Sequence, residues 1–378
     1  MDALTTPLPK DWEVKTFRDI STINQGLQIP ISQRLKAPTE HAKFYITIQA
    51  LNNRKEFEYI KTYNESVVCH KDDILMTRTG NTGMVITNIE GVFHNNFFKI
   101  NFDRTLINKD FLVYFLSLEQ TQKTILKKAG TSTIPDLNHN DFYSLSIPIP
   151  PLNEQIAIAN ILSALDHYLY SLRALILKKE SVKKALSFEL LSQRKRLKGF
   201  NQAWQRVRLG DICEITTGSL DANEMVHYGK YRFYTCAKEY YFIDKYAFDT
   251  EAILISGNGA YVGYVHYYKG KFNAYQRTYV LDNFSEHIIF VKYFLAMFLQ
   301  SHIQTNRNEG NTPYIVMATL KDFEIPLPPL NEQIAIANIL SALDHEIISL
   351  KNKKRQFENI KKALNHDLMS AKIRVLKK

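Results

Sequence analysis

Apolar residues recur at alternating spacings of three and four along two long stretches of the chain. The first stripe comprises Ile158, Leu162, Leu165, Leu169, Leu172 and Ile176, and resumes after a break at Val182, Leu186 and Leu190. The second comprises Ile336, Leu340, Leu343, Ile347 and Leu350, continued by Phe357, Ile360, Leu364 and Leu368. This spacing is typical of a coiled-coil seam. It predicts two helices of about 40 residues, each roughly 60 Å long at 1.5 Å per residue.

A proline pair precedes each stripe and marks the start of each predicted helix. Pro150-Pro151 and Pro328-Pro329 cannot lie inside a helix. We expect Asn153 and Asn331 to be the N-caps, because an Asn side chain can accept a free first-turn amide. Glu154 and Glu332 then place negative charge near the positive end of the helix dipole.

The two stretches belong to an internal repeat. Residues 150–167 and 328–345 both read PPLNEQIAIANILSALDH. Looser matches precede them: WEVKTFRDI at 12–20 with WQRVRLGDI at 204–212, Gly26 with Gly218, 74–83 with 253–263, and FLVYFL at 111–116 with FVKYFL at 290–295. The chain therefore contains two copies of one unit, and each copy is a globular part of about 140 residues followed by a long helix.

Each helix must bury its apolar seam, and the other copy is the simplest partner. A duplicated unit that packs on itself about a pseudo-two-fold axis pairs its helices antiparallel and sends the globular parts to opposite ends. The alternative is that each helix packs only on its own globular part.

Short β-rich runs and turn residues alternate in both globular parts, which predicts a mixed α/β (α+β) fold. In the first copy we expect strands at Lys43–Ile48, Asp73–Met76, Gly83–Ile86 and Phe97–Phe102 and a helix at Lys109–Lys128. Their counterparts in the second copy are Ile253–Ser256, Tyr261–Tyr268, Tyr279–Asp282 and the helix Ile288–Gln300.

Length and composition narrow the class of protein. A chain of 378 residues, 45% of them hydrophobic, predicts two or three packed domains. Cys69, Cys213 and Cys236 lie far apart without CxxC spacing, so neither a disulfide framework nor a zinc site is expected. With no signal-like start and no long apolar run, we expect a soluble cytoplasmic protein.

The net charge of +10 favours an acidic partner, most often nucleic acid. The basic residues concentrate in two stretches: residues 168–200 hold nine Lys and Arg against two acids, and residues 346–378 hold ten against three. They either contact DNA directly or simply solvate the two long helices.

The repeated IPxPPLNEQxAIANILSALD segments, each following a dissimilar globular part that opens at Trp12 or Trp204, resemble the specificity (S) subunits of type I restriction-modification systems. The resemblance covers nearly the whole chain. It implies two target recognition domains, at 1–150 and 200–328, and two conserved spacer helices, at 151–199 and 329–378. Each domain would read one half of an asymmetric double-stranded DNA target, and the coiled coil would set the unread gap.

The resemblance also implies that this chain is not catalytic. Two methyltransferase subunits and two motor-nuclease subunits would dock on it to methylate adenine or cleave DNA. S-adenosylmethionine, ATP and Mg²⁺ would bind those partners, leaving no cofactor, metal or membrane contact to this chain.

Positions that differ between the copies on turn-rich loops are candidate DNA readers. In the first domain they are Arg78, Thr79, Asn81, Asn95, Asn96 and Lys99, and in the second Asn258, Gln276 and Arg277. Arg suits guanine O6 and N7, and Asn or Gln suits adenine N6 and N7. The alternative is that the Gly-Asn pairs only make hairpin turns. For the helix starts or partner docking the candidates are Asn153, Glu154, Gln155, Asn331, Glu332 and Gln333.

Two further features have ordinary interpretations. The tyrosine-dense stretch Tyr228–Tyr246 could stack on DNA, but buried aromatic core is the preferred interpretation. His70, His94, His139 and His266 have no metal-ligand spacing and are interpreted as ordinary surface or core histidines.

An enzyme and a coiled-coil assembly protein are the alternative classes. The glycine-rich SGNGAYVG at 256–263 lacks the spacing of a cofactor-binding loop, and no phosphate loop or amino-methyltransferase motif occurs. A pure assembly protein would have no use for two divergent globular parts.

Overall fold

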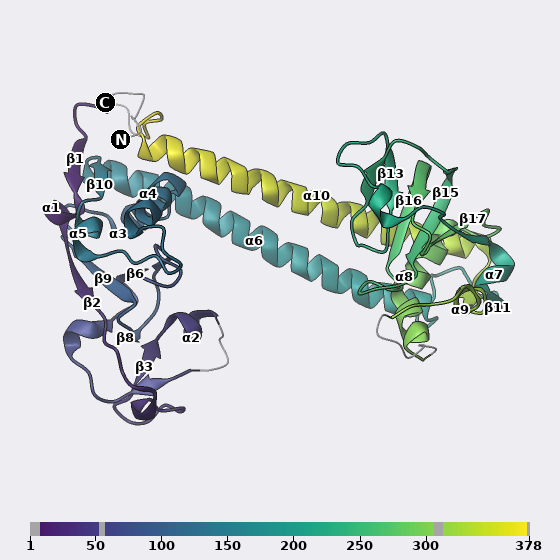
Figure 1. Ribbon diagram of the computed structural model, residues 1–378, viewed down its shortest axis with the longest axis horizontal. Coiled ribbons are helices and arrows are strands. Elements are labelled where there is room, and N and C mark those ends of the chain that lie inside the picture. The colour runs from purple at the N-terminus through teal and green to yellow at the C-terminus, as the bar shows by residue number, and fades with distance from the viewer. Residues whose placement is uncertain (1–7, 53–56, 306–312, 376–378) are drawn as a thin grey trace. The chain divides into compact units, whose positions relative to one another are not determined.

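The computed structural model describes residues 8–52, 57–305 and 313–375 (Figure 1). Within it the chain forms two compact units. The first holds the residues up to Arg173 together with those from Lys353 onward, and the second holds Ala174–Asn352. Each of the two long helices therefore contributes one stretch to each unit.

The globular part of the first unit contains two four-stranded sheets. Their strand orders are β2-β9-β6-β7 and β4-β3-β8-β5, and β1 pairs with β10. The strands are β1 Glu13–Thr16, β2 Ser21–Gln25, β3 Lys43–Ile46, β4 Tyr59–Ile60, β5 Val68–Cys69, β6 Ile74–Thr77, β7 Val85–Ile86, β8 Gly91–Phe93, β9 Phe97–Phe102 and β10 Ser146–Ile149. The helices are α1 Phe17–Ile20, α2 Ile48–Asn52, α3 Lys109–Leu116, α4 Glu119–Ala129 and α5 His139–Tyr143.

The globular part of the second unit contains one six-stranded sheet of order β12-β17-β15-β16-β13-β14, and β11 pairs with β18. Its strands are β11 Gln205–Arg208, β12 Glu214–Thr217, β13 Tyr231–Tyr234, β14 Tyr241–Ile243, β15 Phe248–Ser256, β16 Val265–Ala274, β17 Thr278–Asp282 and β18 Glu324–Leu327. Its helices are α7 Leu209–Ile212, α8 Ile288–Thr305 and α9 Met317–Lys321.

The two globular parts share one topology. β3 runs parallel to β8 as β13 does to β16, and β6 pairs with β9 as β15 does with β17. They differ at β15, which is a continuous strand of nine residues, because the equivalent stretch of the first copy is interrupted between β5 and β6. There the carboxylate of Asp73 accepts the amide of His70 at 2.8 Å and closes a turn. The predicted mixed α/β class is thus confirmed, and the duplication extends to the sheets.

Several predicted elements have other bounds: the strand expected at Lys43–Ile48 ends at Ile46, and the one expected at Ile253–Ser256 begins at Phe248. The helix expected at Lys109–Lys128 is two helices, α3 and α4, because Ser117 ends the first and the backbone is extended at Leu118. The strand expected at Tyr261–Tyr268 begins only at Val265. The residues before it form turns in which the amide of Val262 bonds to the carbonyl of Gly259.

The long helices are α6 Leu152–Leu191 and α10 Leu330–Met369, each 40 residues long as predicted. Their predicted N-caps are wrong by two residues. The carbonyls of Pro151 and Pro329 accept the first helical amides, so these prolines occupy the cap position. Asn153 lies inside the first turn, where its side chain accepts the amide of Glu154 at 2.9 Å.

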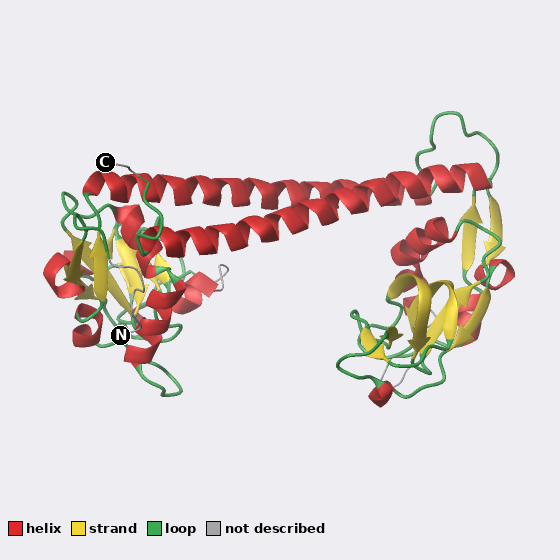
Figure 2. Cartoon of the chain, turned by 90° about the horizontal axis from the view of Figure 1, so that it is seen from above, coloured by secondary structure: helices red, strands yellow, loops and turns green. Residues whose placement is uncertain are grey.

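In the first unit, the start of α6 pairs with the end of α10 (Figure 2). Lys361 Nζ lies 2.5 Å from Asp166 Oδ1, and the rings of Tyr168 and Phe357 are 4.7 Å apart. The partner of the later α6 residue, Tyr168, lies earlier in α10 than the partner of Asp166. The two helices therefore run in opposite directions, and the predicted antiparallel pairing is confirmed in this unit.

In the second unit, the end of α6 pairs with the start of α10 in the same antiparallel sense. Lys179 and Lys351 form ion pairs with Glu346 and Glu180 at 2.9 and 2.6 Å. Lys183 pairs with Asp344 in the same way.

The predicted seam is wrong at one equivalent position in each helix. Val182 and Ile360 are about half exposed, at 45% and 49%. The adjacent Lys183 and Lys361 are partly buried there, and each pairs with an aspartate of the other helix. The seam resumes further along each helix at Leu190 and Leu368, which are buried.

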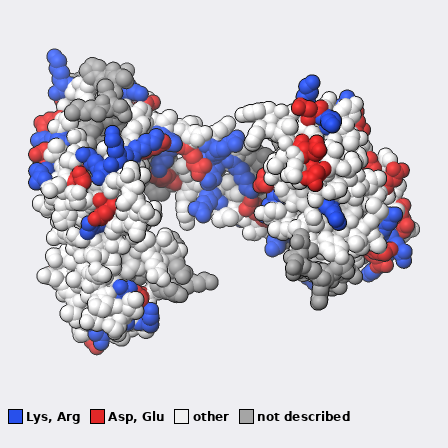
Figure 3. Space-filling view, viewed as in Figure 1, with Lys and Arg blue, Asp and Glu red and all other residues white. Residues whose placement is uncertain are grey.

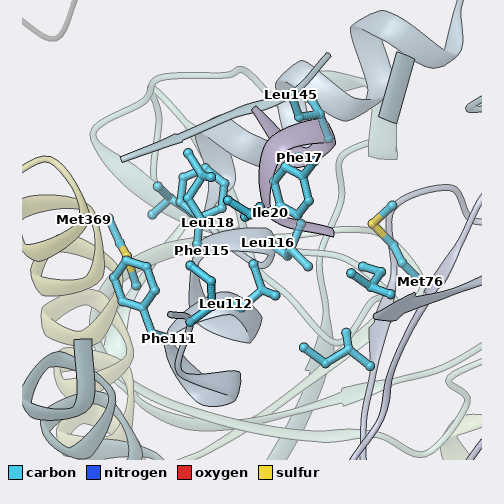
Figure 4. Close-up of a cluster of buried hydrophobic side chains, with 14 of the residues drawn as sticks. Phe17, Ile20, Met76, Phe111, Leu112, Phe115, Leu116, Leu118, Leu145 and Met369 are labelled. Atoms are coloured by element: carbon cyan, nitrogen blue, oxygen red, sulfur yellow. The ribbon is translucent and has the colours of Figure 1, made fainter. Parts of the chain in front are cut away.

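Aromatic and aliphatic side chains from several elements form the core of the first unit (Figure 4). Phe17 of α1 and Phe111 and Phe115 of α3 pack in it. Met369, at the end of α10, joins the same cluster. The end of α10 is therefore part of the hydrophobic core that supports the first globular part.

Candidate nucleic-acid interface

The candidate DNA readers of each unit come together where two strands of its sheet end. In the first unit the amide of Arg78, after β6, bonds to the carbonyl of Asn96, before β9, at 2.8 Å. In the second unit the amide of Gly257, after β15, bonds to the carbonyl of Arg277, before β17, also at 2.8 Å. The loops chosen from the sequence thus occupy equivalent positions of the duplicated fold.

Two basic candidates of the first unit are engaged within the fold. Arg78 Nη2 binds Asp136 Oδ2 at 2.6 Å, and its side chain is only 19% exposed. Lys99 Nζ donates to the carbonyl of Val68 at 2.7 Å. Thr79 forms a β-bridge with Asp136. These side chains hold the loops together in the structure described, so DNA contact by them requires a rearrangement.

Among the amide candidates of the first unit, Asn81 is exposed, whereas Asn95 and Asn96 are partly buried. Asn81 has a positive φ of 64° in the turn that Gly80 begins. Asn95 Nδ2 donates to Gln28 Oε1 at 3.1 Å. The backbone N–H of Asn96 donates to Nδ1 of the neighbouring His94 at 3.1 Å. Asn95 and Asn96 thus lie on the turn between β8 and β9.

In the second unit, Gln276 and Arg277 lie exposed on the turn between β16 and β17. Neither side chain makes a hydrogen bond or ion pair with the residues that the structure describes, although both backbones are anchored. Asn258 is half-buried and bridges Tyr314. Arg277 is therefore an available guanidinium, whereas its counterpart Asn96 offers a carboxamide.

In each unit, buried polar atoms beside the candidate loops have no hydrogen-bond partner in the described part of the chain. They include Arg78 Nε, Asn95 Oδ1 and Ser256 Oγ. Most buried polar groups in proteins are paired, so such groups call for a specific explanation. Two of these three atoms belong to candidate readers and the third lies directly before the candidate loop after β15, whereas His287 Nδ1 and Asn365 Oδ1 lack a partner elsewhere in the described chain.

A close backbone approach aligns the neighbouring loop in both units. A Cβ on Gly26 would lie 2.2 Å from the carbonyl oxygen of His94, and one on Gly218 would lie 1.9 Å from that of Ala274. Only glycine fits at either position. The match of Gly26 with Gly218 therefore has a structural cause, since it lets the loop after β2 or β12 run against the candidate turn.

The candidate residues at the helix starts are mostly buried. Glu154 and Gln155 in the first unit, and Glu332 and Gln333 in the second, have side chains at most 1% exposed. Gln155 Oε1 accepts the amide of Asn108 at 2.8 Å and Gln333 Oε1 accepts that of His287 at 3.0 Å. These four side chains join each helix to its own globular part.

Asn153 and Asn331, by contrast, are exposed. The neighbouring apolar residues Ile156 and Ile334 are also exposed, at 41% and 36%. This repeated outer face of the helix starts is available to a partner, whereas the inner face is occupied.

The preferred interpretation of the tyrosine-dense stretch is wrong for most of its aromatic residues. Tyr234 is buried, but Tyr228 is 95% exposed, and Tyr240, Tyr241, Phe242 and Tyr246 are also exposed. β14 is the last strand of its sheet, and on its outer side the described chain contributes one isolated bridge, from Val226 to Phe242.

Two of the three cysteine thiols are held in the protonated form. Burial raises the pKa of the Cys69 and Cys213 thiols to about 12, which keeps them protonated. Burial, aided by Arg34, lowers the pKa of His94, so its imidazole is neutral at pH 7. Within residues 8–52, 57–305 and 313–375 there is no group of three or more metal-ligating side chains, and no helix there could cross a membrane.

Basic side chains gather over parts of α6 and α10 on the face shown in Figure 3. Several are already paired, such as Lys361 with Asp166 and Lys179 with Glu346. Solvation and pairing of the helices therefore account for part of the basic charge of these stretches.

Comparison with known proteins identifies the family. The model of the type I restriction modification DNA specificity domain matches residues 9–180 and again residues 201–359. The chain belongs to this family. As specificity subunits, its members are DNA-recognition components and not catalytic subunits.

Individual relatives agree with this assignment. The chain is 25% identical over 415 residues to the type I restriction enzyme MjaVIII specificity subunit of Methanocaldococcus jannaschii, covering 97% of this chain and 94% of that protein. It is 40% identical over 162 residues to the EcoDI specificity subunit of Escherichia coli, a match that spans 42% of this chain and 35% of that one. The fold resembles the crystal structure of a type I S subunit from M. genitalium with a TM-score of 0.65 and 19% identity, covering 96% and 98% of the two chains.

Proposed function

We propose that each globular part of this specificity subunit reads one half of a bipartite, asymmetric DNA target. The observation that carries the proposal is chemical difference at equivalent places. Where the first unit offers Asn95 and Asn96, the second offers Gln276 and Arg277 on the same turn of the duplicated fold. Arg and Asn suit different bases, so unlike half-sites are expected.

The paired helices would set the unread gap between the half-sites. Two 40-residue helices, joined by ion pairs in each unit, support the role of a spacer. Spacing between two half-sites is a geometric consequence of how a protein holds its readers. In this proposal residues 1–150 and 200–328 are recognition domains, and residues 151–199 and 329–378 are the spacer.

The chain would direct its partners to the target. We assign it two methyltransferase subunits, which would bind S-adenosylmethionine and methylate adenine. We also assign it two motor-nuclease subunits, which would use ATP and Mg²⁺ to translocate and cleave DNA in the cytoplasm. The exposed Asn153, Ile156, Asn331 and Ile334 at the two helix starts are our candidates for methyltransferase docking.

Mapping modified adenines in the host genome, with the gene for this chain deleted and then restored, tests the proposal. We expect one motif of two unlike halves with a fixed gap, present only when the chain is present. Unchanged methylation after deletion would refute the proposal. A salt titration of the complex on DNA is a second check, because a DNA reader loses affinity steeply as salt rises and an assembly protein shows no DNA binding.

A further inference from the structure

A cleft of about 560 Å³ opens beside Asn96 in the first unit. It is lined by Ile48 and by six residues with polar groups, Arg34, Thr47, Gln49, Asn52, His94 and Asn96. Gln49 and Asn52 carry no signal in the sequence, because nothing local marks the short helix to which they belong.

Helix α2 presents these two carboxamides to the cleft from positions three residues apart, which is about one helical turn. Thr47 Oγ1 accepts the amide of Ala50 at 3.0 Å and starts the helix, while Ala50 itself is buried. Gln49 and Asn52 are exposed, and their side chains make no hydrogen bond with the residues that the structure describes. Both amides therefore retain a free donor and a free acceptor.

The other polar groups of the cleft carry little free charge. The guanidinium of Arg34 donates to the carbonyl of Ile29 at 2.8 and 3.0 Å and to Glu58 at 2.9 Å. The Nδ1 of His94 accepts the amide of Asn96, which leaves the proton of the neutral ring on Nε2 as a donor. The cleft thus offers neutral donors and acceptors, which suit the edge of a base better than a phosphate.

We propose that Gln49 and Asn52, together with Asn96, form a base-reading site of the first recognition domain for an adenine in an A·T pair. A carboxamide can donate to adenine N7 and accept from the N6 amino group at the same time. Guanine is most often read by a guanidinium or ammonium group, and the one guanidinium among the described residues that line this cleft is held by Glu58 and Ile29. This inference rests on the proposed function, because it assumes that the first domain reads DNA.

The second unit has no equivalent pair of amides on a helix in its described residues. Between β13 and β14, the place equivalent to α2, the chain forms no helix; Cys236 Sγ donates to the carbonyl of Arg277, and His266 Nε2 lies 2.9 Å from the carbonyl of Ala237. The amide site therefore belongs to one half-site only.

The test is a genome-wide map of modified adenines in cells that carry the full complex with Gln49→Ala and Asn52→Ala combined. We expect one half-site to lose discrimination at one or two A·T positions, with the other half-site and the gap unchanged. Affinity for the original target should fall about 5- to 150-fold for each bidentate hydrogen-bond pair that the substitutions remove. Gln120→Ala, which removes an exposed carboxamide of α4 in the same unit, is the matched control and should leave the motif unchanged.

A second variant tests which base replaces adenine as the preferred one. Asn52→Asp keeps an acceptor but loses the donor to N7, so preference at one position should move from adenine towards cytosine, whose N4 amino group donates to carboxylates. An unchanged motif in both variants would overturn the inference. Uniform loss of affinity on all sequences with a shallower salt dependence would also overturn it, because that marks a phosphate contact. If wild type itself gave no bipartite motif, the proposed function would have failed first.

Discussion

Trp204 Nε1 donates a hydrogen bond to Glu332 Oε2 at 3.2 Å, the same distance at which Trp12 donates to Glu154. Each buried glutamate also accepts hydrogen bonds from an arginine in the segment that follows the other long helix. Arg374 donates to Glu154, and Arg196 donates to Glu332. One carboxylate in each unit thus joins three segments. These are the start of the globular part, the start of its own long helix and the segment that follows the other long helix.

Arg196→Met should destabilise the second unit markedly. Glu332 is 0% exposed, and removing the arginine leaves its charge buried with Trp204 as the remaining side-chain donor among the described residues. Breaking a buried ion pair from one side typically costs about 3–5 kcal/mol. Urea denaturation of the purified complex would measure the change.

Arg206→Met is the matched control, since its pair with Glu324 is exposed on both sides and should contribute about 0–1 kcal/mol. Equal stability of the two variants would contradict the role of Glu332 as a buried junction.

The Asp344 carboxylate predicts a pH effect on stability. Burial would raise the pKa of Asp344, but hydrogen bonds from Lys183 and Tyr293, with Lys292 nearby, hold this pKa below the ordinary value of 3.8. A lowered folded pKa means that the stabilisation is complete above the unfolded pKa and is lost as pH falls through the folded pKa.

Asp344→Asn should therefore reduce the free energy of unfolding at pH 7 and flatten its decline below about pH 4. Denaturation curves between pH 3 and 7 check this, with the exposed Asp249→Asn as the comparison. Parallel curves for wild type and Asp344→Asn would exclude the effect.

Four residues inserted within Lys178–Lys184 should lengthen the gap between half-sites. One added helical turn extends α6 by about 6 Å, on the order of one to two base pairs of DNA. Both half-site sequences should stay as they are, because the insertion lies outside the globular parts. A methylation map with the original gap would argue against the spacer role.

Arg277→Ala should relax only the half-site read by the second domain. Its guanidinium is exposed and makes no hydrogen bond or ion pair with the described residues. Arg277→Lys keeps the charge but loses the bidentate geometry, so it should relax the same position to a lesser degree. Equal weakening on every DNA sequence would instead mark Arg277 as a phosphate contact.

The long helices and the duplication were predictable because their signals are local. Proline pairs stop the preceding chain, three-four spacing fixes the helices, and an eighteen-residue identity reveals the repeat. The sequence also carries a second signal of the pairing. Glu180, Lys183 and Lys184 match Glu358, Lys361 and Lys362 at the same spacing, and Lys183 and Lys361 each reach an aspartate of the other helix.

The state of the site residues was not predictable, since it depends on distant parts of the chain. Asp136, 58 residues away, binds Arg78, and no local pattern announces that pair. The tyrosines around β14 have the composition of a core, and only the position of the strand at the sheet edge exposes them.

A chain in which residues 205–327 are replaced by a second copy of residues 13–149 tests most directly whether each globular part reads its own half-site. The ends match, because β1 pairs with β10 as β11 pairs with β18. The methylation map should show a symmetric motif, the first half-site followed by its inverted copy across the same gap. Retention of the second half-site in that map would contradict the account.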